Sequence, residues 1–343
     1  MKVMTLTTNF GFGPVSKLNT IINTIKAYDK NIEMDFFGNG ISLEFLRGNG
    51  MVSKYYEVDS DKEFEEISKN INSYDLIINV MNIDILSHLK SKNTKLYFVD
   101  SLSMLWNEKF EGAEAIDCYF IQKFFESEDN IKKMNIPYKV IGPIISVPKK
   151  KNYEVEKKNE LLINFSGLYN PYSKEDFFYN FAKITSSIIM ELFGDKYDQI
   201  IFCCNKKLSN RLSDECNYKN ARFDFYNHDD FLKLCLSVKD IFSLSGITFY
   251  LESSFMNLNV KYLLPSNYYQ YILNNKYRKN DLAITITLED INKDYEIDMD
   301  VSEEKGVELV EKYITETLLN HKEEYATLIK KVICLIKNVK VAV

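Results

Sequence analysis

The sequence predicts an α/β protein with two Rossmann-like domains, each built around a parallel sheet. Short apolar, β-branched runs alternate with amphipathic helical segments along most of the chain. The length of 343 residues exceeds what one compact core usually takes. A polar, lysine-rich stretch interrupts the apolar pattern near the middle. We therefore predict a first domain at 1–145, a linker at 146–159, a second domain at 160–320 and a closing C-terminal helix at 321–343.

The first half begins with the apolar run MKVMTLTT, which predicts a buried first strand. The next helix is expected from about Val15 to Tyr28, with Val15, Leu18 and Ile22 on one face. The remaining strands are expected at 32–38, 54–58, 75–81, 95–100, 117–124 and 138–144. The helices between them are expected at 41–47, 62–71, 83–90 and 125–134. This alternation predicts a doubly wound sheet of six or seven strands.

The second half repeats the alternation. Strands are expected at 160–167, 199–204, 221–226, 240–246 and 260–265. Helices are expected at 176–193, 206–215, 229–237, from about 248 and from about 268. In sheets of this kind, ligands bind at the carboxyl ends of the strands.

Composition and charge exclude several classes of function. The net charge of -6 argues against a nucleic-acid polymer as partner. The six cysteines form no CxxC pair, and the three histidines are scattered, so no metal site and no disulfide framework is expected. The chain shows no signal-peptide pattern and no run of 18 apolar residues, so we expect a cytoplasmic protein without a transmembrane segment.

The stretch NFGFGPVSK, residues 9–17, follows the first strand and contains a glycine loop. It lacks the Gly-Lys pair of a Walker loop, and Ser16 stands where a dinucleotide fingerprint needs its third glycine. Two interpretations stay open. The helix N-terminus behind the loop can favour an anion such as phosphate, or Gly11 and Gly13 only make a tight turn before Pro14.

The stretch SGITFYLE, residues 245–252, carries the richest candidate site. The Ser245-Gly246 turn leads into a helix on which Thr248 and Glu252 share one face. A carboxylate there can accept both hydroxyls of a ribose, while the N–H groups of the turn can meet a diphosphate. The ordinary alternative for Glu252 is a solvated helix carboxylate.

The stretch SNYYQY, residues 266–271, follows the last predicted strand. It places Asn267 and Gln270 three residues apart at a helix opening, where amides can hydrogen-bond sugar hydroxyls. The alternative for Asn267 is an N-cap.

Several motifs together give the chain a family resemblance. They are NFGFGPVSKL, VDSLSMLW at 99–106, YFIQKF at 119–124, NFSGLYNP at 164–171, SGIT at 245–248 and LPSNYYQY at 264–271. With them the chain resembles GT-B glycosyltransferases, especially the branch of the peptidoglycan N-acetylglucosaminyltransferase, and within it cytosylglucuronate synthase and related proteins. The resemblance covers the chain nearly end to end.

The resemblance implies a metal-independent transferase of the hexosyltransferase type. Such an enzyme moves a sugar from a UDP-sugar to a small acceptor and releases UDP, with no cofactor besides the donor substrate. It further implies glucuronate as the sugar and cytosine or another nucleobase as the acceptor, in nucleoside biosynthesis. The first domain would then hold the acceptor and the second the nucleotide sugar, across a cleft. The implied donor-binding residues are Gly11, Gly13, Ser16, Lys17, Gly167, Ser245, Gly246, Thr248, Glu252, Asn267 and Gln270.

An inverting transfer needs a base for the proton of the acceptor. Asp100, at the carboxyl end of KLYFVD, is the first candidate and Glu44 the second. Trp106 would stack on a planar acceptor. The structural alternatives are that Asp100 caps a helix and that Trp106 lies in the core.

Two other classes of function stay open. A UDP-sugar hydrolase or epimerase would keep the donor residues and act without an acceptor. A noncatalytic nucleotide-sugar-binding protein would bind UDP and turn nothing over.

Overall fold

The structure is a computed structural model that describes residues 1–47, 50–58, 61–89, 93–105, 109–124, 128–147, 155–168 and 175–279. The chain divides into two compact units, an N-terminal unit (Met1–Ser146) and a C-terminal unit (Val147–Val343). The closing helix expected at 321–343 and the acceptor residue Trp106 lie outside the described residues.

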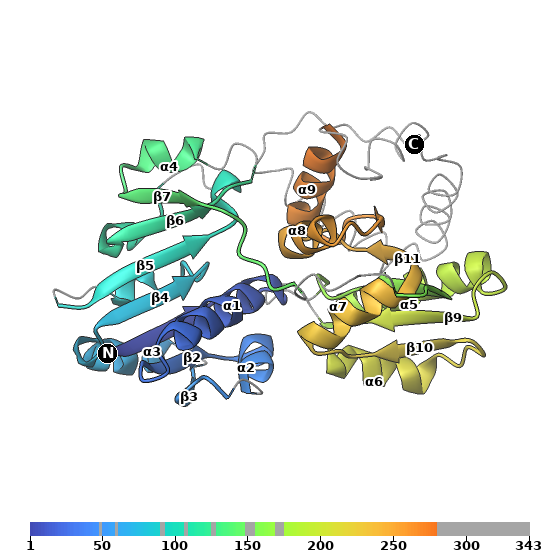
Figure 1. Ribbon diagram of the computed structural model, residues 1–343, viewed down its shortest axis with the longest axis horizontal. Helices are drawn as coiled ribbons and strands as arrows, with labels where there is room; N and C mark the ends of the chain where they lie inside the picture. The colour runs from blue at the N-terminus through green and yellow to red at the C-terminus, as the bar shows by residue number, and fades with distance from the viewer. Residues whose placement is uncertain are drawn as a thin grey trace. The chain divides into compact units, whose positions relative to one another are not determined.

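The N-terminal unit contains a seven-stranded parallel sheet in the order β3-β2-β1-β4-β5-β6-β7 (Figure 1). The strands are β1 (Lys2–Thr7), β2 (Glu33–Gly38), β3 (Lys54–Glu57), β4 (Leu76–Val80), β5 (Lys95–Asp100), β6 (Cys118–Gln122) and β7 (Tyr138–Ile141). The strand order reverses direction between β1 and β4, where a doubly wound sheet opens a crevice for ligands.

The helices of this unit cover both faces of the sheet. They are α1 (Gly13–Tyr28), α2 (Gly40–Arg47), α3 (Asp61–Asn70) and α4 (Asp129–Met134), with single 3₁₀ turns η1 (Ile71–Ser73), η2 (Leu86–Leu89), η3 (Ser103–Leu105) and η4 (Ala113–Ala115). Successive residues of a strand point to opposite faces, so Val3 packs with α1 and α2 while Met4 belongs to a second cluster with residues of α3.

Two expectations for this unit need correction. Within the described residues, the helix expected at 83–90 is only the 3₁₀ turn η2, in which the N–H of Leu86 donates to the carbonyl of Ile83 and that of His88 to the carbonyl of Ile85. The side chain of Asn79 closes a turn just before this segment. The amide of Asn79 accepts from the backbone N–H of Asn82 at 3.0 Å and donates to its carbonyl at 2.8 Å. Helix α1 begins at Gly13, two residues before the expected start, because Pro14 fits the first helical turn.

The C-terminal unit contains a five-stranded parallel sheet in the order β10-β9-β8-β11-β12. The strands are β8 (Lys158–Asn164), β9 (Gln199–Cys203), β10 (Ala221–Asp224), β11 (Val238–Ser243) and β12 (Val260–Tyr262). Strand β8 begins inside the range expected for the linker. The direction reverses between β8 and β11, so the expected ligand position lies there.

The helices of the C-terminal unit connect these strands. They are α5 (Glu175–Phe193), α6 (Lys206–Glu215), α7 (His228–Ser237), α8 (Ile247–Phe255) and α9 (Tyr268–Lys279). The right-handed crossover rule places α5 and α6 on one face and α7 and α8 on the other. Rings of Phe231 on α7 and Phe249 on α8 accordingly lie 5.3 Å apart.

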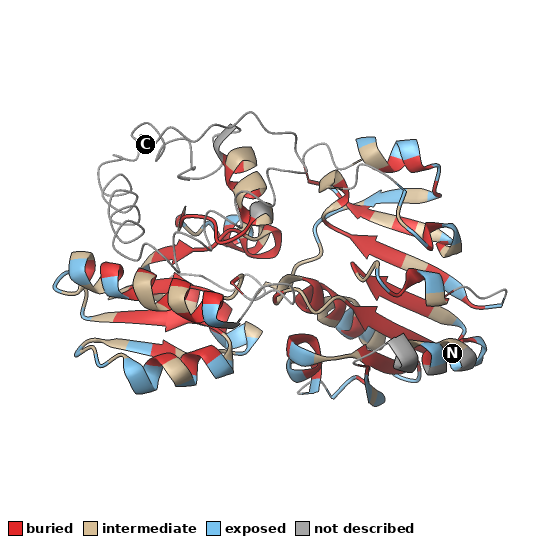
Figure 2. Cartoon of the chain, turned by 180° about the vertical axis from the view of Figure 1, so that it is seen from behind, coloured by how far each residue is buried: buried red, intermediate tan, exposed pale blue. Residues whose placement is uncertain are grey.

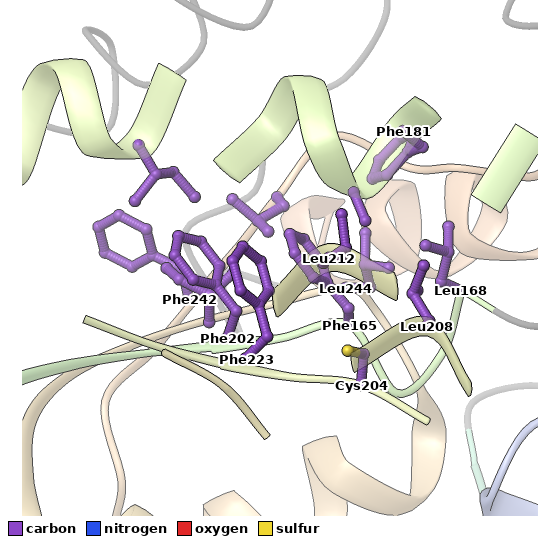
Figure 3. Close-up of a cluster of buried hydrophobic side chains, with 14 of the residues drawn as sticks. Phe165, Leu168, Phe181, Phe202, Cys204, Leu208, Leu212, Phe223, Phe242 and Leu244 are labelled. Atoms are coloured by element: carbon purple, nitrogen blue, oxygen red, sulfur yellow. The ribbon is translucent and has the colours of Figure 1, made fainter. Parts of the chain in front are cut away.

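The core of the C-terminal unit lies between its sheet and helices α5 and α6. Figure 3 shows this aromatic cluster, in which Phe202 stacks on Phe223 at 4.8 Å between centroids. Figure 2 shows that the strands of each sheet are largely buried, whereas the helices carry exposed residues on their outer faces. Each unit therefore has a core of its own.

Candidate functional site

The carboxyl ends of β8 and β11 in the C-terminal unit are joined by buried polar side chains. Asn164 ends β8, and its amide Nδ2 donates to the hydroxyl of Ser243, the last residue of β11, at 3.1 Å. The amide oxygen of Asn164 accepts from the backbone N–H of Ser166 at 3.0 Å. These bonds fix the turn after β8 beside the point at which the strand order reverses.

Gln270 connects that turn to the loop after β12. Its Nε2 donates to the carbonyl of Gly167 at 2.8 Å, and its Oε1 accepts from the backbone N–H of Ser266 at 2.8 Å. Asn267 precedes α9, and its Oδ1 accepts from the backbone N–H of Gln270 at 3.0 Å. The geometry of Asn267 is therefore that of an N-cap. Both amides, which we predict to contact a donor sugar, make hydrogen bonds within the unit.

The turn after β11 leads directly into α8. The hydroxyl of Ser245 donates to the side-chain oxygen of Asn274, and the amide of Asn274 donates to the carbonyl of Leu263 at 3.2 Å. Gly246 is the N-cap of α8 and has no side chain of its own with which to cap the helix. A Cβ added at Gly246 would meet no described heavy atom within 4 Å. A helix N-terminus favours an anion, and the space beside Gly246 leaves room for one at this end of α8.

Gly167 lies close to this turn as well. A Cβ added there would lie 3.3 Å from Nε2 of Gln270 and 3.6 Å from the carbonyl oxygen of Ser245. An alanine there would press on Nε2 of Gln270 and make an ordinary contact with the carbonyl of Ser245. The structure thus brings Gly167, Ser245 and Gln270 together at one end of the sheet, as the sequence predicts for neighbouring strand ends.

Glu252 lies on α8, one turn after Thr248, and both side chains are buried. The interpretation of Glu252 as a solvated carboxylate is therefore wrong, because only 2% of its side chain is exposed. Its Oε1 lies 3.0 Å from Nε2 of His228, whose side chain is 15% exposed. The two atoms are at hydrogen-bonding distance but not aligned, and Oε1 has no hydrogen-bond partner among the residues that the structure describes.

The surroundings of Glu252 are poorly solvated. Burial raises the pKa of the nearby Cys235 thiol, and the thiol of Cys203 and the carboxylate of Glu252 add to that shift. A carboxylate in such surroundings gains more from each hydrogen bond than a solvated one does.

Sequence reasoning missed His228, because it showed no partner in its own stretch. The pair forms only because α7 and α8 both begin at the carboxyl edge of the sheet and lie on the same face. The ring contact between Phe231 and Phe249 shows the same proximity. The strand order of the sheet indicates that His228 and Glu252 lie close together, whereas no local sequence motif does.

The glycine loop lies in the N-terminal unit, after β1. Gly11 has a φ of 62°, the left-handed region that glycine favours, so the tight turn requires it. Gly13 belongs to α1, and the backbone N–H of Ser16 donates to the carbonyl of Phe12 at 2.9 Å. Ser16 and Lys17 are both buried. Binding of a diphosphate by these residues stays a prediction.

The two candidate bases differ in their surroundings. Asp100 ends β5 and is fully buried, with Oδ1 accepting from the backbone N–H of Leu102 at 2.6 Å and Oδ2 accepting from the hydroxyl of Tyr119. That arrangement fits the capping alternative better than a base that meets an acceptor. Glu44 lies exposed on α2.

Neither a metal-binding cluster nor a membrane-spanning helix occurs in the described part of the chain. The described ranges bring together no group of three or more His, Cys, Asp or Glu side chains that could hold a metal ion. Within the same part of the chain, no helix is both long and apolar enough to cross a membrane.

Comparison with known proteins gives matches among solved structures alone. No family model and no curated protein matches the sequence. The spinosyn forosaminyltransferase SpnP superposes with a TM-score of 0.55 at 10% identity, covering 97% of this chain and 94% of its own. Phytolacca americana UGT2, solved with UDP-2-fluoro-glucose and pterostilbene, gives 0.51 at 10% identity and covers 98% and 99%. The UDP-GlcNAc 2-epimerase of Methanocaldococcus jannaschii gives 0.50 at 15% identity and covers 88% and 94%. Together with the two parallel sheets, these similarities confirm the predicted fold class: the chain has the GT-B fold.

Proposed function

We propose that this protein is a nucleotide-sugar-dependent glycosyltransferase. It would transfer a sugar from a UDP-sugar to a small acceptor and release UDP, without a bound metal. The observation that carries the proposal is the short helix α8 after β11, which begins at the glycine N-cap Gly246 and carries the buried carboxylate of Glu252. The N-terminus of α8 suits the diphosphate group, and the carboxylate suits the ribose of a nucleoside diphosphate.

The chemistry of the donor explains the assignment of roles. Glycosyl transfer builds negative charge on the leaving diphosphate, which the N–H groups after Gly246 would stabilise. The ribose of the nucleotide presents two adjacent hydroxyls, and a carboxylate can accept from both. Glu252 would therefore bind the ribose while the start of α8 binds the phosphates.

The finer identity of the substrates follows from the family resemblance of the sequence. We propose glucuronate as the transferred sugar and cytosine or another nucleobase as the acceptor. Turnover of UDP-glucuronate in the presence and absence of cytosine tests this directly, because product that appears only with cytosine supports both assignments.

A UDP-sugar epimerase or hydrolase is the second candidate. The fold match to a UDP-GlcNAc 2-epimerase favours this candidate. So do the hydrogen bonds that both carboxylate oxygens of Asp100 accept, because they leave a transferase without its first candidate base. Release or inversion of the sugar without any acceptor would identify this class.

Thermal stabilisation by a panel of nucleotides tests the shared part of both candidates. We expect UDP and one UDP-sugar to raise the unfolding midpoint of the wild type, and Glu252→Ala to lose most of that shift. Asp229→Asn, on the exposed side of α7, serves as a matched acidic control that keeps it. A wild type that responds to no nucleotide would overturn the proposal.

A further inference from the structure

We propose that His228 is a positioning residue for Glu252, and that it thereby sets the preference of the site for ribose over 2′-deoxyribose. The inference rests on the proposed function, since it assigns a specificity role at the same site. Nε2 of His228 and Oε1 of Glu252 lie 3.0 Å apart, which is within hydrogen-bonding distance.

The packing of α7 against α8 fixes this pair. His228 and Phe231 are three residues apart on α7, and Phe249 and Glu252 are three apart on α8, so each pair shares one helical face. The two rings meet at 5.3 Å, and the imidazole and carboxylate meet beside them. The start of α7 is itself held by Asn227, whose side chain accepts from the backbone N–H of Asp230 at 3.0 Å.

The carboxylate needs such a neighbour. Glu252 is almost fully buried, and a buried carboxylate with too few hydrogen bonds is costly. Its two oxygens offer about four acceptor positions, of which a ribose diol uses two. A donor on Oε1 would hold one rotamer and leave Oε2 directed at the diol. The present separation is already a hydrogen-bonding distance, so an imidazole with its N–H directed at Oε1 would donate to it.

The test compares binding of UDP and 2′-deoxy-UDP by titration calorimetry. We expect the wild type to prefer UDP by about tenfold or more, since the deoxy compound loses one hydrogen bond to a charged group. In His228→Ala the preference should fall to about twofold or less, because UDP loses more affinity than 2′-deoxy-UDP, which has only its 3′-hydroxyl to bond the carboxylate. A purely structural role would weaken both ligands equally.

Two isosteric variants separate positioning from folding. Glutamine places its amide nitrogen near the position of Nε2 of the histidine, whereas asparagine places it near Nδ1. His228→Gln should therefore restore the preference for UDP, and His228→Asn should not, although both keep a polar side chain of similar volume. Asp229→Asn is the neighbouring control and should leave both affinities unchanged.

The outcomes distinguish this inference from the proposed function. A wild type that binds no UDP overturns both. A wild type that binds UDP without any preference over 2′-deoxy-UDP overturns the inference, as does a His228→Ala variant that keeps the preference. Loss of preference in His228→Ala with recovery in His228→Gln supports it.

Discussion

At the scale of single residues, Asp100 shows how a side chain at a promising position can have a structural role. It stands where the sequence predicts a base, at the carboxyl end of β5, yet both of its oxygens accept hydrogen bonds within the unit. The backbone N–H of Leu102 and the hydroxyl of Tyr119 are its donors. We infer that the carboxylate holds the turn after β5.

We expect Asp100→Asn to lower the free energy of unfolding by about 1–3 kcal/mol, because the variant weakens hydrogen bonds to a buried charged group. Tyr119→Phe removes one of those bonds without touching the carboxylate, so it should lower the stability in the same direction. Urea unfolding measures both variants. If Asp100 is instead the base, Asp100→Asn should lower the turnover rate by about a thousandfold, whereas Tyr119→Phe should leave that rate largely unchanged.

The cysteines of the C-terminal unit give a second prediction at this scale. Burial raises the pKa of the Cys203 thiol to about 12, and it also raises the pKa values of Cys204 and Cys235. Since the thiolate is the reactive form, these three residues should resist iodoacetamide at about pH 8 in the folded protein and react in urea. Mass spectrometry of the labelled peptides checks this, and rapid labelling of native Cys203 would contradict it.

At the scale of the element, Gln270 joins the loop after β12 to the turn at Gly167, which lies 103 residues before Gln270 in sequence. Gln270→Ala should destabilise the protein by about 2 kcal/mol, because it leaves the buried N–H of Ser266 and the carbonyl of Gly167 without this partner. Gln270→Glu keeps an acceptor for Ser266 and loses the donor to Gly167. Urea unfolding should rank it below the wild type, and equal stability of all three proteins would contradict the structural role.

The pairing of α5 with α6 predicts a pH dependence. Hydrogen bonds from Tyr179 and then Lys183 lower the pKa of Glu215 to about 2, below the value near 4.3 of an unperturbed glutamate. A lowered pKa in the folded state stabilises the protein above about pH 4.3, and that contribution is lost as the pH falls towards 2.

Urea unfolding of the wild type and Glu215→Gln between about pH 7 and pH 3 measures this contribution. The stability difference should be small, since the side chain is well exposed, and it should shrink as the medium becomes more acidic. A difference that grows towards low pH would contradict the assignment.

Most elements were predictable because their patterns are local. The run ELLINFSG predicts β8 from its apolar letters, and Gly11 marks a turn because few other residues adopt a positive φ. The apolar periodicity of 83–90 predicts a full helix, but the described part of this segment forms a 3₁₀ turn, and periodicity over so short a stretch does not separate the two. The pair of His228 and Glu252 was not predictable from either stretch, because it depends on which sheet face two separate helices cover.

At the scale of the whole molecule, each of the two units has its own core. We therefore expect scanning calorimetry to resolve two unfolding transitions, one of which the isolated fragment 1–146 reproduces. UDP should raise the midpoint of the other transition, because Gly246 and Glu252 belong to the C-terminal unit. A shift of the fragment's own transition by UDP would place nucleotide binding in the N-terminal unit.

The strand order of the C-terminal sheet also decides when the candidate site can assemble during synthesis. Asn164 and Ser243, which join β8 to β11, are 79 residues apart in sequence, and the chain between them builds the other side of the sheet. Until β11 leaves the ribosome, one edge of the apolar strand β8 has no neighbour. The candidate site thus forms only after β11 has joined β8, and a nascent chain that pauses before residue 243 exposes an edge prone to aggregation.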